Sequence, residues 1–156
     1  MANTDNVDVF NQYLFDKLVD HQADLGMQDT WYGDQEKIPR TPCVAVEAGP
    51  KNRELNGSPR RFMVTLESYI MIYHDKIQDT QENARQAQKR AEAVEAVLHA
   101  DAQMRTDPGD GNSGLVIHSF VMSNEPGYVT RGGNLMSVSR LTFRATSQVM
   151  LPYSAT

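Results

Sequence analysis

The clearest hydrophobic pattern in the chain lies between residues 61 and 73, where apolar side chains recur at alternate positions. Because successive side chains of a strand point to opposite faces, this alternation predicts a long β-strand. One face of it carries the apolar residues Phe62, Val64, Leu66, Ile70 and Ile72. The other face carries Met63, Tyr69, Met71 and Tyr73. The second face therefore needs cover for part of its length, either from a helix of the same chain or from a neighbouring subunit.

Two segments show the three- and four-residue spacing of an amphipathic helix. The first follows Thr4 or Asp5, either of which can cap it, and its apolar positions are Val7, Phe10, Leu14 and Leu18. The second follows Asp79 and Glu82, a variant of the capping box, and its apolar positions are Ala84, Ala87, Ala91, Val94 and Leu98. Since most of this second stripe is alanine, the helix is expected to lie close to the sheet.

The remaining chain reads as shorter strands and open connections. Residues 25–42 contain glycines and prolines around Trp31 and Tyr32 and are expected to form a long loop. A short strand at 43–48 ends at Gly49-Pro50, and residues 51–61 are expected to be an exposed basic connection. Further on, 115–122 and 135–151 are predicted to be β-structure, the latter as one strand or a pair. Residues 101–114 and 123–134 are expected to be loops.

The order of these elements is α-β-β-α-β-β, which predicts an α+β fold. It would have one mainly antiparallel sheet with two principal helices packed on a face. A chain of 156 residues suits one core, so residues 1–156 are taken as a single domain. The apolar share of 40% is that of a globular protein and not of a disordered one.

The composition also limits the cellular location of the chain and the chemistry of its cysteine. No apolar run approaches the roughly 20 residues of a membrane span, and the first ten residues are polar and acidic, unlike a signal peptide. We expect a chain that is cytosolic at synthesis and has no membrane partner. The single cysteine, Cys43, sits in an apolar run and is interpreted as a small buried hydrophobe.

The net charge of −5 is distributed in blocks along the chain. Residues 1–36 carry a net −7, residues 37–61 a net +4, residues 62–125 a net −5, and residues 126–156 a net +3. Such blocks suit a subunit with one negative and one positive face, which can steer a like subunit into head-to-tail contact. The alternative is that the charges interleave in space and only solvate the surface.

Two motifs resemble ligand-binding sites but lack the surrounding sequence that such sites need. Residues 109–114 match the letters of a dinucleotide-binding turn, but a helix precedes them and a strand follows, which is the reverse of what phosphate binding requires. Asp107, Asp110 and Asn112 have calcium-type oxygens, yet the twelfth position of that loop is His118 where a bidentate Glu is needed.

The histidines do not point to a site either. They are scattered without metal-ligand spacing, at positions 21, 74, 99 and 118. A phosphate-binding role for the bases of residues 51–61 is disfavoured by the acidic total and the lack of interleaved aromatics. We therefore predict no catalytic residue, no cofactor, no metal and no enzymatic activity.

The layout of the whole chain resembles the bacteriophage tail terminator family, also called tail completion or head-to-tail joining proteins. The features that carry the resemblance are the N-terminal helix, the strand from Pro42, the strand over 61–73, the alanine-rich helix over 79–99 and the later strands between glycine loops. The resemblance implies a virion protein that assembles in the host cytoplasm as a ring, commonly a hexamer. The ring would bind the tail tube protein on one side and the head connector or neck protein on the other, and viral DNA would pass through its lumen without specific binding.

Such a ring needs interface residues, and large aromatics, methionines and arginines are enriched at interfaces. The candidates are Trp31, Tyr32, Arg60, Arg61, Met63, Tyr69, Met71 and Tyr73. The four strand residues among them would alternatively pack under the protein's own helices. Another virion subunit of similar fold, such as a tail tube subunit or neck adaptor, is the alternative function. A small enzyme or ligand-binding domain with a pocket at residues 101–114 is the remaining one.

Overall fold

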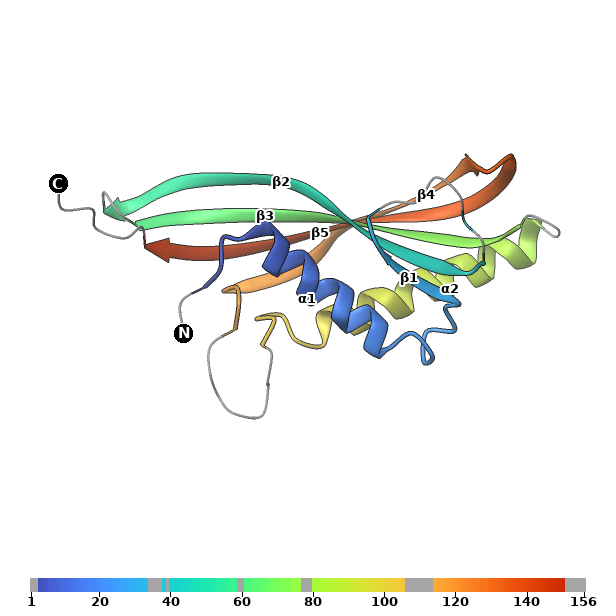
Figure 1. Cartoon of the computed structure of the whole chain (residues 1–156), viewed down its shortest axis with the longest axis horizontal. Coiled ribbons are helices and arrows are strands. Elements are labelled where there is room, and N and C mark those ends of the chain that lie inside the picture. Colours follow the sequence, from blue (N-terminus) through green and yellow to red (C-terminus); the bar gives the residue numbers. More distant parts are fainter. Residues whose placement is uncertain are drawn as a thin grey trace.

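The computed structural model describes residues 3–33, 38, 40–58, 61–76, 80–105 and 114–150. The elements within these residues are α1 (Val7–Asp20), β1 (Asp29–Tyr32), β2 (Cys43–Ser58), β3 (Arg61–Lys76), α2 (Thr80–His99), β4 (His118–Arg131) and β5 (Asn134–Met150). The strands form one sheet in the order β1-β2-β3-β5-β4 (Figure 1). β1 pairs with β2 in parallel, whereas the other three pairings are antiparallel. The predicted α+β class is confirmed.

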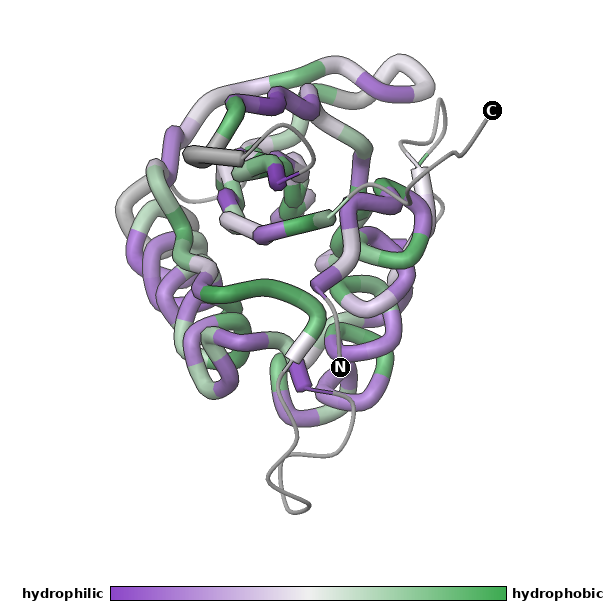
Figure 2. The backbone as a smooth tube through the Cα atoms, turned by 90° about the vertical axis from the view of Figure 1, so that its left-hand side faces the viewer, coloured by the Kyte–Doolittle hydropathy of each residue, from purple (hydrophilic) through white to green (hydrophobic). Residues whose placement is uncertain are grey.

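Both helices cover the same face of the sheet and bury the main core against it. Figure 2, an end-on view, shows them next to each other below the twisted strands. Phe10 of α1 stacks on Phe143 of β5 with ring centroids 6.0 Å apart. The predicted alternation of β3 is confirmed, because Val64, Leu66, Ile70 and Ile72 are completely buried in this core. Burying each such large side chain contributes roughly 1.5–3 kcal/mol.

The helix ends differ from the sequence expectation in detail. α1 is capped by Asn6 and not by Thr4 or Asp5, because the Asn6 side chain accepts a hydrogen bond from the Val9 N–H at 3.1 Å. Thr4 accepts instead from the Asn6 N–H. In α2 the predicted residues Ala91, Val94 and Leu98 are buried, but Ala84 is exposed. Asp79 and the side chain of Glu82 lie outside the described residues.

The second strand is much longer than predicted. β2 does not end at Gly49-Pro50 but continues to Ser58, so the expected basic connection over 51–61 is wrong. The strand continues because it pairs with β3 along most of its length, with register shifts between Ala48 and Lys51 and between Leu55 and Ser58. At the first of these shifts Gly49 lies so close to β3 that an added Cβ would be 2.8 Å from the Glu67 carbonyl oxygen.

Two predicted loops also contain strand. Residues 29–32, expected in a loop, form β1 beside β2. Residues 123–131, also expected in a loop, are the second half of β4, and Gly132 and Gly133 make the turn into β5 with φ of 58° and 82°. Pro126 is compatible with β4 because this strand is at the edge of the sheet. β5 is one strand and not a pair. Of the expected loop over 101–114, residues 106–113 lie outside the described residues.

Candidate interaction surfaces

The face of the sheet opposite the helices is the first candidate surface, and we call it the helix-free face. Met63, Tyr69 and Met71 of β3 lie on it half-buried. From β5, the Arg140 guanidinium lies 4.1 Å from the centre of the Tyr69 ring, a cation–π contact. Arg144 donates two hydrogen bonds to one carboxylate oxygen of Glu67, at 2.6 and 3.0 Å. The surface is thus held in place by contacts between β3 and β5.

The other end of the helix-free face is covered by the chain itself. Tyr73 and Cys43 are completely buried there, in a second cluster with Ala45, Met136 and Val138. Because Tyr73 is inside the subunit, its prediction as an exposed interface residue is wrong. The cover comes from the side chains packed against this cluster, and not from the helices: Trp31, Ile38, Met71 and Val129. The interpretation of Cys43 as a buried hydrophobe is confirmed.

Trp31 and Tyr32 are neighbours in sequence but lie on opposite faces. Trp31 is half-buried in the second cluster, and its indole N–H is buried without an acceptor among the described residues. Tyr32 lies on the helix side, where its hydroxyl donates to Asp8 at 2.7 Å and its ring meets Phe15 edge-on. Burial first, and then Asp8, raises the pKa of Tyr32. Arg61 is exposed at the far end of β3, and Arg60 lies outside the described residues. The predicted residues therefore do not form one patch.

Several ion pairs join charge blocks that are separate in the sequence. Arg53 pairs with Asp5 at 3.0 Å, and Arg144 pairs with Glu67. Arg40 pairs with Asp29 through its guanidinium, and this carboxylate raises the pKa of Arg40 by hydrogen bonding and by its charge. At these positions the charges interleave in space. Surface pairs of this kind contribute little stability, so they mainly reduce the separation of the charges into two faces.

A groove of about 550 Å³ lies between α2 and the β4–β5 hairpin, and sequence reasoning did not predict it. On the helix side it is lined by Ala84, Ala87 and Ala91 and by the acidic Glu92 and Glu95. On the sheet side it is lined by Pro126, Tyr128, Ser137, Val138 and Ser139, among others. The exposed Ala84 is explained here, because α2 begins over the groove and not over the core. Small alanine side chains leave this space open. The alanine stripe of α2 is therefore the one sign of the groove that the sequence contained.

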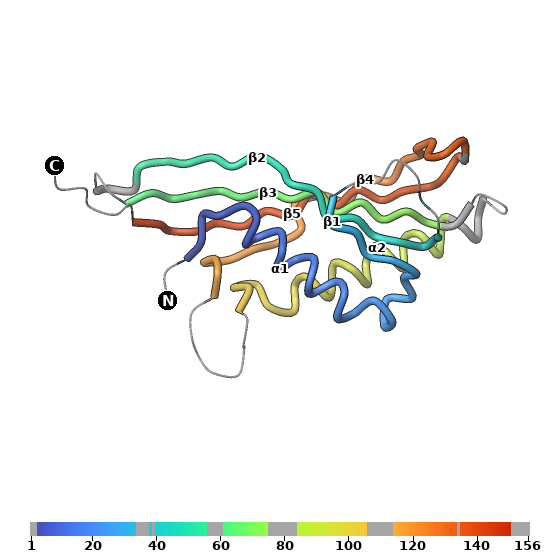
Figure 3. The backbone as a smooth tube through the Cα atoms, in the orientation of Figure 1, coloured from blue at the N-terminus to red at the C-terminus, as the bar shows by residue number. Residues whose placement is uncertain are grey.

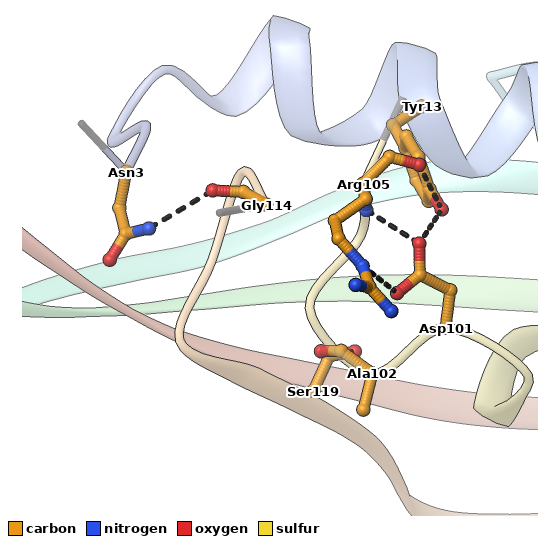
Figure 4. Close-up of polar contacts among 7 residues, drawn as sticks. All are labelled: Asn3, Tyr13, Asp101, Ala102, Arg105, Gly114 and Ser119. Atoms are coloured by element: carbon orange, nitrogen blue, oxygen red, sulfur yellow. Dashed lines mark hydrogen bonds and ion pairs between the residues drawn. The ribbon is translucent and has the colours of Figure 1, made fainter. Parts of the chain in front are cut away.

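The segment after α2 is held by a polar cluster (Figure 4). Asp101, which is almost completely buried, accepts hydrogen bonds from the Arg105 backbone N–H at 2.6 Å and from the Tyr13 hydroxyl at 3.3 Å. Burial, followed by the nearby Asp101, raises the pKa of Tyr13 to about 12. The Ser119 hydroxyl donates to the Ala102 carbonyl, and the Asn3 amide donates to the Gly114 carbonyl. This cluster ties α1, the end of α2 and β4 together.

The four histidines each have a separate structural environment. His74 is buried between Ser139 and Arg90, and His99 accepts a hydrogen bond from the Val121 N–H on the outer edge of β4. His118 stacks on Phe120, and His21 lies 3.6 Å from Asp24. In the described part of the chain, no three His, Cys, Asp or Glu side chains are grouped closely enough to hold a metal ion. Nor does any helix there have the length and apolar character to span a membrane.

No protein-family model and no curated protein matches the chain. Among solved structures, its fold is similar to a chain from the virion of a native gene transfer agent particle, with a TM-score of 0.60 and 13% sequence identity. The match covers 94% of this chain and all of the other. At this identity the likeness shows a shared fold.

Proposed function

We propose that this protein is a non-enzymatic structural subunit of a phage-like virion. In this role it forms a ring that ends the tail tube and joins it to the head connector. The observation that carries the proposal is the fold similarity to a virion chain over nearly the full length of both molecules. It agrees with the tail terminator resemblance, which rests on the order of the elements in the sequence.

The surfaces of the molecule support an assembly role. A closed ring forms when one surface of a subunit binds a different surface of the next, and the contact repeats around an axis. The two edges of this sheet are unlike. On one side, β1 pairs with only the first four residues of β2. On the other side, β4 has a free outer edge only in part, because the Val121 N–H there donates a hydrogen bond to the His99 ring. Edges that differ in this way suit contact between different surfaces and not contact of a surface with itself.

The helix-free face supplies a further contact surface within this proposal. Met63 and Tyr69 are half-buried on the same face as Arg140 and Arg144, and aromatic, methionine and arginine side chains are the residue types enriched at interfaces. The proposed partners are further copies of the chain, a tail tube protein and a head connector protein. From the family resemblance we expect a hexamer whose lumen passes DNA without sequence recognition.

Native mass spectrometry and negative-stain electron microscopy of the purified protein test the proposal, alone and with tail tubes present. We expect single rings, formed either in solution or on the ends of tubes. A protein that stays monomeric in both conditions contradicts the proposal. Extended tubes of the protein itself would identify a tail tube subunit instead.

A further inference from the structure

Leu55 is a large apolar side chain that the subunit leaves uncovered. It is 68% exposed, near the end of β2. Cross-strand pairing aligns it with Phe62 of β3, which in turn pairs with Val149 of β5, and both of these pack against the main core. Leu55 therefore points to the helix side of the sheet. Figure 3 shows β2, β3 and β5 continuing past the start of α1. Leu55 follows Arg53, which contacts Asp5 just before α1 begins.

Two cations share this side of β2. Arg53 pairs with Val64 and Lys51 with Leu66, both core residues, so their side chains also lie on the helix side. Both reach Asp5, Arg53 through the carboxylate and Lys51 through the backbone carbonyl. The Arg53 side chain remains 44% exposed in spite of this contact. The end of β2 thus presents a row of Lys51, Arg53 and Leu55.

The groove has the complementary character. Its alanines and Pro126 give it apolar walls, and Glu92 and Glu95 add negative charge. A volume of about 550 Å³ is enough for a leucine side chain and the aliphatic part of a neighbouring cation. The groove lies between α2 and the β4–β5 hairpin, at the opposite end of the molecule from the end of β2 (Figure 1). The β2 row of one chain therefore cannot fill the groove of the same chain.

We propose that Leu55 of one copy inserts into the groove between α2 and the β4–β5 hairpin of the next copy, with Lys51 and Arg53 facing its Glu92 and Glu95. This inference rests on the proposed ring and names the contact that closes it. The two surfaces differ and lie at opposite ends, which is the arrangement of a head-to-tail contact. A second copy is the favoured occupant, because every copy carries both the cationic, apolar row and the acidic, apolar groove.

The first test changes the inserted side chain. Leu55→Asp places a charge in an apolar site, and we expect it to raise the protein concentration at half assembly at least about tenfold. Val19→Asp is the matched control. Val19 is 42% exposed on α1 and belongs neither to the β2 row nor to the groove nor to the helix-free face, so this variant should assemble like the wild type. Light scattering across concentration measures assembly.

The second test fills the groove. Ala87→Arg adds a large side chain inside it, whereas Ala93→Arg adds the same side chain on the exposed surface of α2, outside the groove. We expect loss of assembly for Ala87→Arg and wild-type assembly for Ala93→Arg. Far-UV circular dichroism and thermal unfolding establish that each variant is folded. Assembly of Ala87→Arg at the wild-type concentration would overturn the proposed contact.

The third test uses charge reversal in two separate proteins. Arg53→Glu changes the row, and Glu92→Arg with Glu95→Arg changes the groove. Each protein alone meets like charges at every junction and is expected to assemble poorly. In an equimolar mixture, alternating copies restore opposite charges at every junction, so rings should return. Failure of the mixture to assemble better than its two components would count against the contact.

The outcomes separate this inference from the ring itself. If the wild type forms rings and Leu55→Asp and Ala87→Arg form them equally well, the ring stands and the contact is wrong. If the wild type is monomeric both alone and with tail tubes, the proposed function fails, and the contact fails with it.

Discussion

At the scale of single residues, the buried polar groups of this protein hold the connections between elements in place. Asp101 accepts from the Tyr13 hydroxyl and from the Arg105 N–H, so a single carboxylate joins α1 to the turn after α2. A buried carboxylate of this kind is stabilising only while its partners remain, because an unpaired buried charge is costly. The role of the cluster is therefore structural.

Because of Tyr13, the stability of the protein is expected to depend on pH in the alkaline range. Its pKa is about 12 in the folded chain, against an ordinary value of 10.0. Between these values the folded state retains a proton that the unfolded state has lost. The contribution of Tyr13 is therefore complete below pH 10 and is lost as the pH rises through about 12. We expect Tyr13→Phe to flatten the fall in stability above pH 10, as measured by urea unfolding at a series of pH values.

The exposed Tyr128 supplies the control for this experiment, since Tyr128→Phe removes a hydroxyl without disturbing the Asp101 cluster. An unchanged pH dependence in Tyr13→Phe would contradict the assignment. Near pH 7 the same variant should lose about 1 kcal/mol of stability for the hydrogen bond to Asp101.

At the scale of elements, the long β2–β3 pair determines the shape of the sheet. β2 passes an irregularity at Gly49, pairs with β3 from Lys51 to Leu55, and pairs again at Ser58 after a second register shift. Much of this second half is polar, so it has no strong apolar alternation of its own. Its strand conformation comes from the hydrogen bonds to β3, and the close approach of the two backbones at Gly49 is part of that pairing.

Gly49→Ala tests the close approach. The new Cβ would lie 2.8 Å from a backbone oxygen, which cannot move away as a flexible side chain would. We expect a loss of about 1–3 kcal/mol in the free energy of unfolding, measured by denaturant titration. Gly127→Ala in β4 is the comparison, because the nearest atom to its Cβ is 3.9 Å away. Equal stabilities of the two variants would show that β2 can shift at no cost.

At the scale of the whole molecule, the two faces of the sheet have different roles. The helix side contains the main core, whereas the helix-free face is divided between a cluster covered by the chain itself and the more open stretch around Met63 and Tyr69. Ion pairs among the described residues connect the charge blocks, which makes the surface more mixed than the linear charge pattern suggested. Assembly is therefore expected to depend on local complementarity more than on the overall separation of charge.

Two substitutions on β3, Tyr69→Asp and Tyr73→Asp, should have different effects if Tyr69 is an interface residue and Tyr73 a core residue. Tyr69 is half-buried under Arg140, so the charge should abolish ring assembly and leave the far-UV circular dichroism spectrum largely intact. Tyr73 is completely buried, so the same change there should unfold the protein. Ring assembly by Tyr69→Asp, or its global unfolding, would exclude the helix-free face around Tyr69 as an intermolecular surface.

The sequence by itself determined both helices, the alternation of β3, the burial of Cys43 and the α+β class. Each of these segments lies between the core and the solvent, so its apolar residues recur with the period of the helix or strand. That period can be read from the sequence of the segment alone. Only the tertiary structure decided that 29–32 and 51–58 are strands, because a polar strand is specified by the partner with which it pairs. It also decided that Tyr73 is buried, that Leu55 is exposed and that α2 and the β4–β5 hairpin enclose a groove. Each of these depends on which segments meet across the fold, and residues far apart in the chain set that.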